Sequence, residues 1–336
     1  QNLNYYSKEI TFDGQLGKIY NNAQLMGKID LPTHISTSFR FIASISTFDY
    51  YKKDKLFSRN DKPSFNSKDE RFVKLMVALP FLANKRAEFS LGYGQLEDNY
   101  FQSSVIDFDK DRSDRSTYKL LGGSIGFYGS TLNTRQYATK GYLEKLIAQV
   151  FTGRERFEPG NPQEGYSPSP QERQSWLQIS YMKEAYHTMG PKFTLGWMAE
   201  ALYSSKNFSE NYTATMMQAG EFAPTPHSKL MYNEAFRANQ YVAAGIKPIY
   251  VLNDMFQFRT EFYGFTPIFP IKKNALNKAY YGKAFSRFEY MGEVSVICHL
   301  PFGAISAYVN HYSSPRREWN VGMTIGWQLF NYRFVE

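Results

Sequence analysis

Several features that would indicate a soluble enzyme or a disulfide-rich secreted domain are scarce in this chain of 336 residues. Cysteine occurs once, as Cys298, which excludes a disulfide framework and a cysteine-based metal site. No uncharged apolar run reaches the roughly 18 residues that a spanning helix needs, which excludes a helical membrane protein. Runs of about five or six like charges are also absent. The net charge of +8 therefore does not indicate a nucleic-acid partner.

Aromatic residues, in contrast, are abundant. The 28 Phe, 26 Tyr and 4 Trp make up 17% of the chain, and yet the mean hydropathy is −0.48. A disordered chain is poor in aromatic residues, so this composition argues for an ordered fold. Many rings in a chain that is polar on average favour half-buried strands separated by wide polar loops.

Large apolar residues alternate with small or polar residues along many short segments, with the period of a β-strand. From Trp319 to Leu329 every second residue is large and apolar, and the segments 193–201, 87–94 and 73–79 repeat this pattern. A strand of an outer-membrane barrel alternates in this way, with apolar side chains toward lipid and polar side chains toward the lumen. A strand of a soluble sandwich also alternates, so the pattern alone leaves both folds open.

The lengths of the connections distinguish these two folds. Long polar connections cover roughly 52–68, 101–115, 154–173, 206–235 and 268–283. Short connections such as 81–85 and 187–191 lie between them. Outer-membrane barrels show this asymmetry because their periplasmic turns are short and their external loops are long. The alternation predicts an all-β fold, a transmembrane antiparallel β-barrel in the outer membrane of a Gram-negative bacterium.

The expected strands lie near 2–7, 8–18, 19–32, 36–51, 68–81, 86–100, 115–129, 140–153, 173–187, 191–206, 240–251, 253–267, 283–298, 303–313 and 317–331. These segments make about 15 strands, and because bacterial single-chain barrels have even strand numbers we expect a barrel of about 16. Residues 1–336 are therefore predicted to form one barrel domain, with its first strand or strands and any preceding domain missing.

Four further segments match one known family in their order and spacing. They are residues 133–141 (NTRQYATKG), 153–160 (GRERFEPG), 236–245 (FRANQYVAAG) and 301–310 (PFGAISAYVN). With the terminal strand through Asn331, the chain from about residue 14 resembles the C-terminal barrel of bacterial patatin-like phospholipases. That barrel belongs to the superfamily of surface antigens and outer-membrane assembly proteins. The resemblance implies that a lipase domain precedes the barrel, which anchors it and helps to export it.

The resemblance also assigns a role to one arginine. In this superfamily, an Arg-containing motif on the sixth external loop folds back into the barrel, and Phe236, Arg237 and Ala238 stand at the matching place. Relatives carry Gly at the position of the alanine. We expect the guanidinium to pair with a carboxylate on the wall, with Glu261 or Glu289 as candidates. A solvated loop arginine is the alternative interpretation.

Patterns that imitate an active site have simpler explanations here. The segment 122–126 places Ser124 in a G-x-S-x-G motif, but it lies within a strand and lacks the helix that a nucleophile elbow requires. The aspartates of 107–114 lack the Gly and the final acidic residue of a calcium loop. The five histidines show no metal-ligand spacing. We therefore expect no catalytic residue, no metal and no cofactor in this chain.

Aromatic side chains on the apolar faces are expected to contact lipid or its headgroups. The residues assigned to this outer surface are Trp197, Phe256, Phe258, Phe288, Trp319 and Trp327. The lipid bilayer is thus the first expected partner. An N-terminal lipase domain, or other outer-membrane or periplasmic proteins, would follow from the resemblance, and nucleic acid is not expected.

Three functions stay open at this point. The main prediction is a barrel that anchors and exports an N-terminal patatin-like phospholipase, although the chain itself carries none of the catalytic residues of that enzyme. The first alternative is a barrel for the assembly or translocation of outer-membrane proteins, in which a lateral seam and the Arg237 loop act. The second is a passive porin or a barrel subunit of a larger surface complex.

Overall fold

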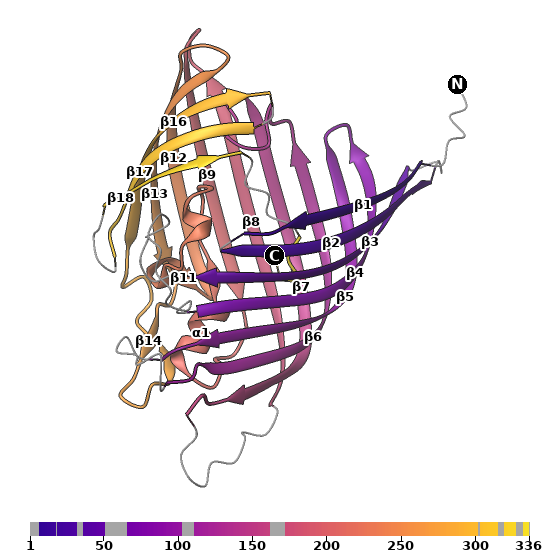
Figure 1. Ribbon diagram of the computed structural model, residues 1–336, viewed down its shortest axis with the longest axis vertical. Helices are drawn as coiled ribbons and strands as arrows, with labels where there is room; N and C mark the ends of the chain where they lie inside the picture. Colours follow the sequence, from indigo (N-terminus) through magenta and orange to yellow (C-terminus); the bar gives the residue numbers. More distant parts are fainter. Residues whose placement is uncertain are drawn as a thin grey trace.

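One antiparallel sheet of 14 strands dominates the computed structural model, with the order β1-β2-β3-β4-β5-β6-β7-β8-β9-β12-β13-β16-β17-β18. The structure describes residues 7–17, 19–31, 36–50, 66–102, 111–161, 172–301, 303–314, 319–326 and 332–335. Each strand pairs with its neighbours along the sheet in an up-and-down order, and the sheet curls around a central space (Figure 1). The predicted all-β antiparallel fold is therefore confirmed.

The strands of this sheet are β1 (Ser7–Gln15), β2 (Tyr20–Leu31), β3 (Thr37–Tyr50), β4 (Asn66–Leu82), β5 (Lys85–Tyr100), β6 (Asp114–Ser130), β7 (Gly141–Glu158), β8 (Glu172–Thr188), β9 (Phe193–Ser204), β12 (Gln240–Val251), β13 (Phe256–Pro267), β16 (Glu289–Leu300), β17 (Gly303–Tyr312) and β18 (Trp319–Ile325). The expected segment 8–18 forms β1, whereas 2–7 lies almost wholly outside the described residues.

Two expected boundaries differ from the structure. Strand β7 continues to Glu158 instead of ending near residue 153, because its outer part pairs with the first residues of β6. Strand β16 begins at Glu289 and not near residue 283. Residues 283–286 form a turn in which the Ser286 hydroxyl donates to the Lys283 carbonyl, and Phe285 takes a left-handed φ of 51°. These contacts end the extended conformation before the sheet is reached.

The two faces of the sheet are opposite in character. Along β13, Phe256, Phe258 and Phe262 are exposed on the outer face, whereas Gln257 and Arg259 are buried on the inner face. This arrangement is the reverse of a soluble protein, in which apolar side chains face the interior. An outer face of this kind is stable against hydrocarbon, and the inner face lines a polar lumen.

The expected lipid-facing aromatics mostly lie on this outer face. Phe256, Phe258, Phe288 and Trp319 are between 37% and 71% exposed. Trp197 is half-buried on the same side of β9 as the exposed Phe193. Trp327 lies outside the described residues. Among the helices of the described residues, none has the length and apolar character needed to cross a membrane.

The connections alternate between short and long, as predicted. Residues 83–84, 189–192 and 252–255 are short turns at one end of the sheet. The segment 205–239 at the other end, which we call the lumen loop, contains α1 (Tyr212–Gln218), β10 (Gly220–Glu221), η1 (Ser228–Leu230), η2 (Glu234–Phe236) and β11 (Arg237–Ala238). Figure 1 shows α1 and β11 within the space that the sheet surrounds.

A second hairpin and the C-terminal segment complete the interior. Strands β14 (Ile271–Lys273) and β15 (Ala279–Tyr281) pair with each other and pack on α1. Phe334 lies against the inner wall in a hydrophobic cluster with Phe72 and Phe151. The Lys74 ammonium donates to the carbonyl of Arg333 at 3.0 Å, which fixes the backbone of this segment.

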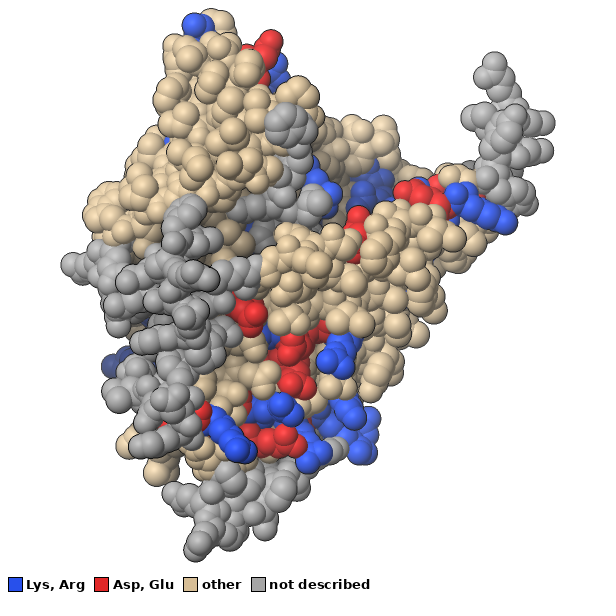
Figure 2. Space-filling view, in the orientation of Figure 1, with Lys and Arg blue, Asp and Glu red and all other residues tan. Residues whose placement is uncertain are grey.

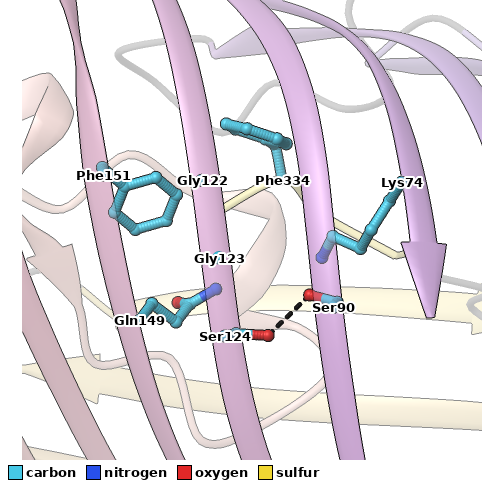
Figure 3. Close-up of a pocket in the computed structure, with 8 residues that line it drawn as sticks. All are labelled: Lys74, Ser90, Gly122, Gly123, Ser124, Gln149, Phe151 and Phe334. Carbon is cyan, nitrogen blue, oxygen red and sulfur yellow. Dashed lines mark hydrogen bonds between the residues drawn. The ribbon is translucent and has the colours of Figure 1, made fainter. Parts of the chain in front are cut away.

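Glycines of the inner wall make the space that Phe334 occupies. A Cβ atom on Gly94 would lie 2.9 Å from the Phe334 ring, and one on Gly92 would lie 3.1 Å from it. In Figure 3 the ring stands beside Gly122, while Ser124 points toward Ser90 and shares a 2.6 Å hydrogen bond with it. A Cβ on Gly122 of β6 would lie 3.3 Å from the same ring, so the glycines of β5 and β6 serve close packing, which is a common use of glycine within a strand.

Candidate functional site: the loop inside the barrel

The short hairpin of the lumen loop creates a buried ion pair. Strands β10 and β11 place Gly220 opposite Ala238 and Glu221 opposite Arg237. The Nη2 atom of the arginine lies 2.8 Å from Oε2 of the glutamate, and the two side chains are 4% and 13% exposed. Because both charges are largely buried, each is stable only while the other lies beside it. The pair therefore holds the loop in one conformation.

The same guanidinium also caps the C-terminal end of α1. Its Nη1 atom lies 3.2 to 3.5 Å from the carbonyl oxygens of Met216, Met217 and Ala219. The last carbonyls of a helix have no partner within the helix and carry its negative dipole end, so a cation is favourable there. Arg237 thereby joins the helix, the hairpin and the carboxylate into one rigid unit.

Two tyrosines cover this guanidinium. Its carbon lies 4.8 Å from the ring centre of Tyr232 in the loop and 5.9 Å from that of Tyr50 on the wall strand β3. A cation over an aromatic face gains electrostatic stabilisation. Burial alone would lower the pKa of Arg237, but Glu221 and the two tyrosines reverse this effect and raise it, so the arginine stays charged.

The carboxylate partner of the loop arginine differs from the one expected. Glu261 pairs with Arg259 at 2.9 Å, and Glu289 pairs with Arg287 at 2.7 Å. Both expected wall partners are thus neutralised by the residue two positions earlier. Arg259 lies on the same face of β13 as Glu261, and Arg287 lies just before β16, which begins at Glu289. Glu221 takes their place because the register of the loop hairpin sets it directly opposite.

The two residues flanking the motif arginine are packed in the lumen core. Phe236 and Ala238 are buried in one cluster with wall residues of β12 and β13. The Phe236 ring lies 5.6 Å from Phe265 and 5.8 Å from Tyr312, measured between ring centres. Ala238 is in a strand and does not take a positive φ, so the loop does not need a glycine there.

A second buried cluster lies around His227, a loop residue that shows no metal-ligand or catalytic spacing in the sequence. Its Nδ1 atom is 2.7 Å from Oε1 of Glu293 on β16, and its Nε2 atom is 3.1 Å from Oγ of Ser306 on β17. The imidazole also stacks on Tyr308, with ring centres 3.6 Å apart and planes at 14°. The loop is therefore fastened to two wall strands through one side chain.

The order Glu293, His227, Ser306 imitates a catalytic triad, in which a carboxylate orients a histidine that activates a serine. The surroundings do not suit that chemistry. Ser306 is 0% exposed, and its hydroxyl also contacts Tyr137 at 3.1 Å and Thr324. A substrate carbonyl has no space beside this oxygen, so the cluster acts as an attachment of the loop.

A short turn enters the lumen from the opposite end and meets this cluster. Residues 131–140 connect β6 to β7, and Tyr137 takes a left-handed φ of 57° within them. Gln257 donates to the carbonyl of Tyr137 at 3.1 Å, and Arg259 donates to that of Ala138 at 3.0 Å. The turn 131–140 thus lies against the inner wall, where the Tyr137 hydroxyl is 3.5 Å from Nε2 of His227 and shares the Ser306 hydroxyl with it.

The helix of the lumen loop is attached to the wall by polar contacts. Asn211 caps α1 by accepting from the backbone N–H of Ala214, and its amide donates to the Tyr100 hydroxyl at 2.8 Å. Gln218 at the other end of the helix donates to Asp98 at 2.5 Å. Both wall residues lie on β5, so this strand fixes both ends of the helix.

One lysine of the loop is enclosed by aromatic rings. The Lys206 ammonium lies 4.5 Å from the ring centre of Tyr118 and 4.7 Å from that of Trp176. Burial lowers the pKa of Lys206 to about 8, although Glu155 and Asp98 oppose this shift. Neither this lysine nor Glu221 shows a periodic pattern in the sequence, because both lie in a loop. Within the described residues, no group of His, Cys, Asp and Glu side chains is arranged to hold a metal ion.

Several solved structures are similar to this chain. No protein-family model and no curated protein sequence matches the chain. BamA from Haemophilus ducreyi, lacking POTRA domains 1–3, is similar with a TM-score of 0.60 and 11% identity over 94% of this chain and 63% of that one. The ferric preacinetobactin receptor BauA from Acinetobacter baumannii has a TM-score of 0.44 and 10% identity over 91% of this chain and 49% of its own. CdiB from Escherichia coli has a TM-score of 0.42 and 9% identity over 94% of this chain and 66% of its own.

The likeness to BamA concerns the fold, since the sequences are only 11% identical. This chain spans 63% of the length of that BamA chain. Together with the apolar outer face and the polar inner face, the likeness shows that the chain has the fold of an outer-membrane β-barrel.

Proposed function

We propose that this chain is the membrane barrel of an assembly or translocation protein in the outer membrane of a Gram-negative bacterium. The observation that carries the proposal is the lumen loop, which is fastened inside the barrel through the buried Arg237–Glu221 pair. A passive porin keeps a water-filled lumen. Here the lumen loop, the turn 131–140 and Phe334 all lie inside the sheet. A lumen filled by these segments suits a protein that opens only when it inserts or translocates a client polypeptide.

Buried charges in the loop support this function better than they support stability alone. Replacing a buried ion pair by apolar residues is often neutral or stabilising, so such a pair is weak evidence for a purely structural role. The better-attested role of buried charged groups is to select a single conformation, because any other conformation would leave the charges unpaired. We infer that the unit formed by α1, β10 and β11 must stay intact for the barrel to process its client.

Depletion in the native cell tests the proposal. Loss of the chain should reduce the amount of at least one outer-membrane or secreted protein, measured by quantitative proteomics of the outer-membrane and medium fractions. Wild-type chain should restore that protein, and Arg237→Ala should not. Arg156→Ala, which removes one member of an exposed ion pair on β7, should restore it. Unchanged outer-membrane and secreted proteomes after depletion would exclude an assembly or translocation function.

Anchoring and export of an N-terminal patatin-like phospholipase is the second candidate. It is favoured by the turn 131–140, whose resemblance to that family coincides with buried contacts of Tyr137 and Ala138. The reading frame before Gln1 and a lipase assay on intact cells test this function. A G-x-S-x-G elbow with a downstream Asp-Gly-Gly, together with surface lipase activity that disappears on deletion, would favour the lipase parent over the assembly barrel.

A further inference from the structure

A row of basic side chains crosses the outer face of five neighbouring strands. The ladder sets Arg71 of β4 opposite Gln95 of β5, and Gln95 opposite Lys119 of β6. It then sets Lys119 opposite Arg154 of β7, and Arg154 opposite Arg173 of β8. We call the four cations of this line, Arg71, Lys119, Arg154 and Arg173, the cation row.

All four members of the cation row are exposed. Within the described part of the chain, none of them forms an ion pair. The next cations toward the long loops differ, because Arg115 lies 3.3 Å from Glu97 and Arg156 lies 2.8 Å from Glu158. Charged atoms of both signs gather at the lower end of the face shown in Figure 2, and the strands above present a mainly tan surface. Among the described residues, Arg115 and Arg156 are therefore neutralised, whereas the cation row has no acidic partner.

The depth of the row places it at the edge of the lipid-facing belt. Two positions further along the strands, Val73, Tyr93 and Leu121 are exposed on the same face, and Leu75 and Leu91 follow. Two residues of strand correspond to about 7 Å. Tyrosine is typical of the zone where hydrocarbon meets headgroups. The row lies at the strand ends that lead to the long connections, which are the external ends of an outer-membrane barrel.

Unpaired like charges side by side are unfavourable without a counter-charge. Lys119, Arg154 and Arg173 occupy three adjacent strands, which are about 4.8 Å apart. Directly opposite like charges destabilise a sheet, and the low dielectric of the neighbouring belt strengthens the repulsion. A phosphate resolves this repulsion, because guanidinium groups bind its oxygens bidentately and an ammonium adds a point charge.

We propose that the cation row binds the phosphate groups of an anionic lipid in the outer leaflet, a phosphorylated glycolipid of the lipid A type. The position at the rim of the belt selects a lipid headgroup, since the acyl chains of such a molecule would then lie along the exposed Val73, Leu75 and Leu121. A soluble polyanion would find better access on the loops. This inference rests on the barrel fold and the external position of the long loops, and it is independent of the proposed function.

Two double variants on the same two strands test the proposal. Lys119→Gln with Arg154→Gln removes two members of the row, and the matched control Arg115→Gln with Arg156→Gln removes two ion-paired cations nearer the loops. Each full-length barrel is purified in a phosphate-free zwitterionic detergent, and its binding of bisphosphorylated lipid A is titrated by native mass spectrometry. Each basic side chain near an anionic surface contributes about fivefold to binding, so the row variant should bind about 25-fold more weakly. The control should change binding by less than about threefold, because its cations are already neutralised.

Further experiments distinguish a lipid phosphate from a soluble phosphate and verify that each variant folds. Dephosphorylated lipid A should bind the wild-type barrel as weakly as phosphorylated lipid A binds the row variant, and inorganic phosphate should not compete at millimolar concentration. Arg154→Lys, which keeps the charge, should bind within about fivefold of wild type. Heat-modifiable gel mobility verifies that every variant forms a barrel. Equal weakening in the row and control variants, no preference for phosphorylated lipid, or the same dependence on the row for a soluble polyanion such as heparin would each overturn the proposal.

Discussion

Replacing Arg237 with alanine should destabilise the lumen loop by about 3–5 kcal/mol, because it leaves the Glu221 carboxylate buried without its partner. Loss of the cation–π contacts with Tyr232 and Tyr50 adds about 0.5–1 kcal/mol each. The carbonyls at the end of α1 also lose their donor. Urea unfolding of the barrel refolded into liposomes, followed by tryptophan fluorescence, measures the effect on the whole barrel. Limited trypsin cleavage at Lys229 measures the opening of the loop itself.

A double-mutant cycle decides whether the pair acts as described. Arg237→Ala, Glu221→Ala and the double variant should show a coupling energy of at least about 2 kcal/mol, because the second change removes a charge that the first has stranded. Arg156→Ala is the control, since this arginine and its partner Glu158 are 52% and 40% exposed. That variant should cost about 1 kcal/mol or less. Additive single effects at Arg237 and Glu221 would refute a coupled clamp.

Three further predictions concern other parts of the lumen. Because the folded-state pKa of Lys206 is lowered to about 8 from 10.5, its charge opposes folding below about pH 8, and the barrel should become more stable by up to about 3 kcal/mol as the pH rises toward 10.5. Lys206→Met should remove this rise in urea titrations, and a rise that persists in the variant would assign it to another group. His227→Ala leaves Glu293 buried without its main partner and detaches the lumen loop from the wall there, so it should raise the conductance of the barrel in planar bilayers. His227→Gln should raise the conductance less. Equal conductance of the wild-type protein and both variants would contradict a role of His227 in closing the lumen. Gly94→Ala places a Cβ 2.9 Å from the Phe334 ring and should lower the free energy of unfolding by about 1–3 kcal/mol. The second change Phe334→Ala should restore that stability. If it does not, the glycine is needed for another reason.

The barrel wall was predictable because its pattern is local. The alternation along β13 requires only that Phe258 and Arg259 point to opposite faces, and the period of a strand ensures this. The burial of Arg237 followed from the family resemblance. Its partner did not, because β10 has only two residues and a hairpin that short has no period from which a register can be read.

The C-terminal segment shows a different limit of sequence analysis. The lumen-facing glycines Gly92, Gly94 and Gly122 are visible in the sequence, and such residues indicate a bend or close packing. Nothing in their spacing says which segment fills the space. The aromatic partner, Phe334, is supplied from the other end of the chain, and a contact between distant segments leaves no local signal.

The packing of Phe334 against the inner wall also constrains the order in which parts of the chain fold. The recess exists only after β5 and β6 have paired, and the ring that fills it lies beyond β18 in the sequence. Contacts between such distant segments form late, because a long stretch of chain must first be ordered around them. The arrival of this ring therefore follows the pairing of β5 with β6, and its protection from a chemical label would report that this part of the inner wall has formed.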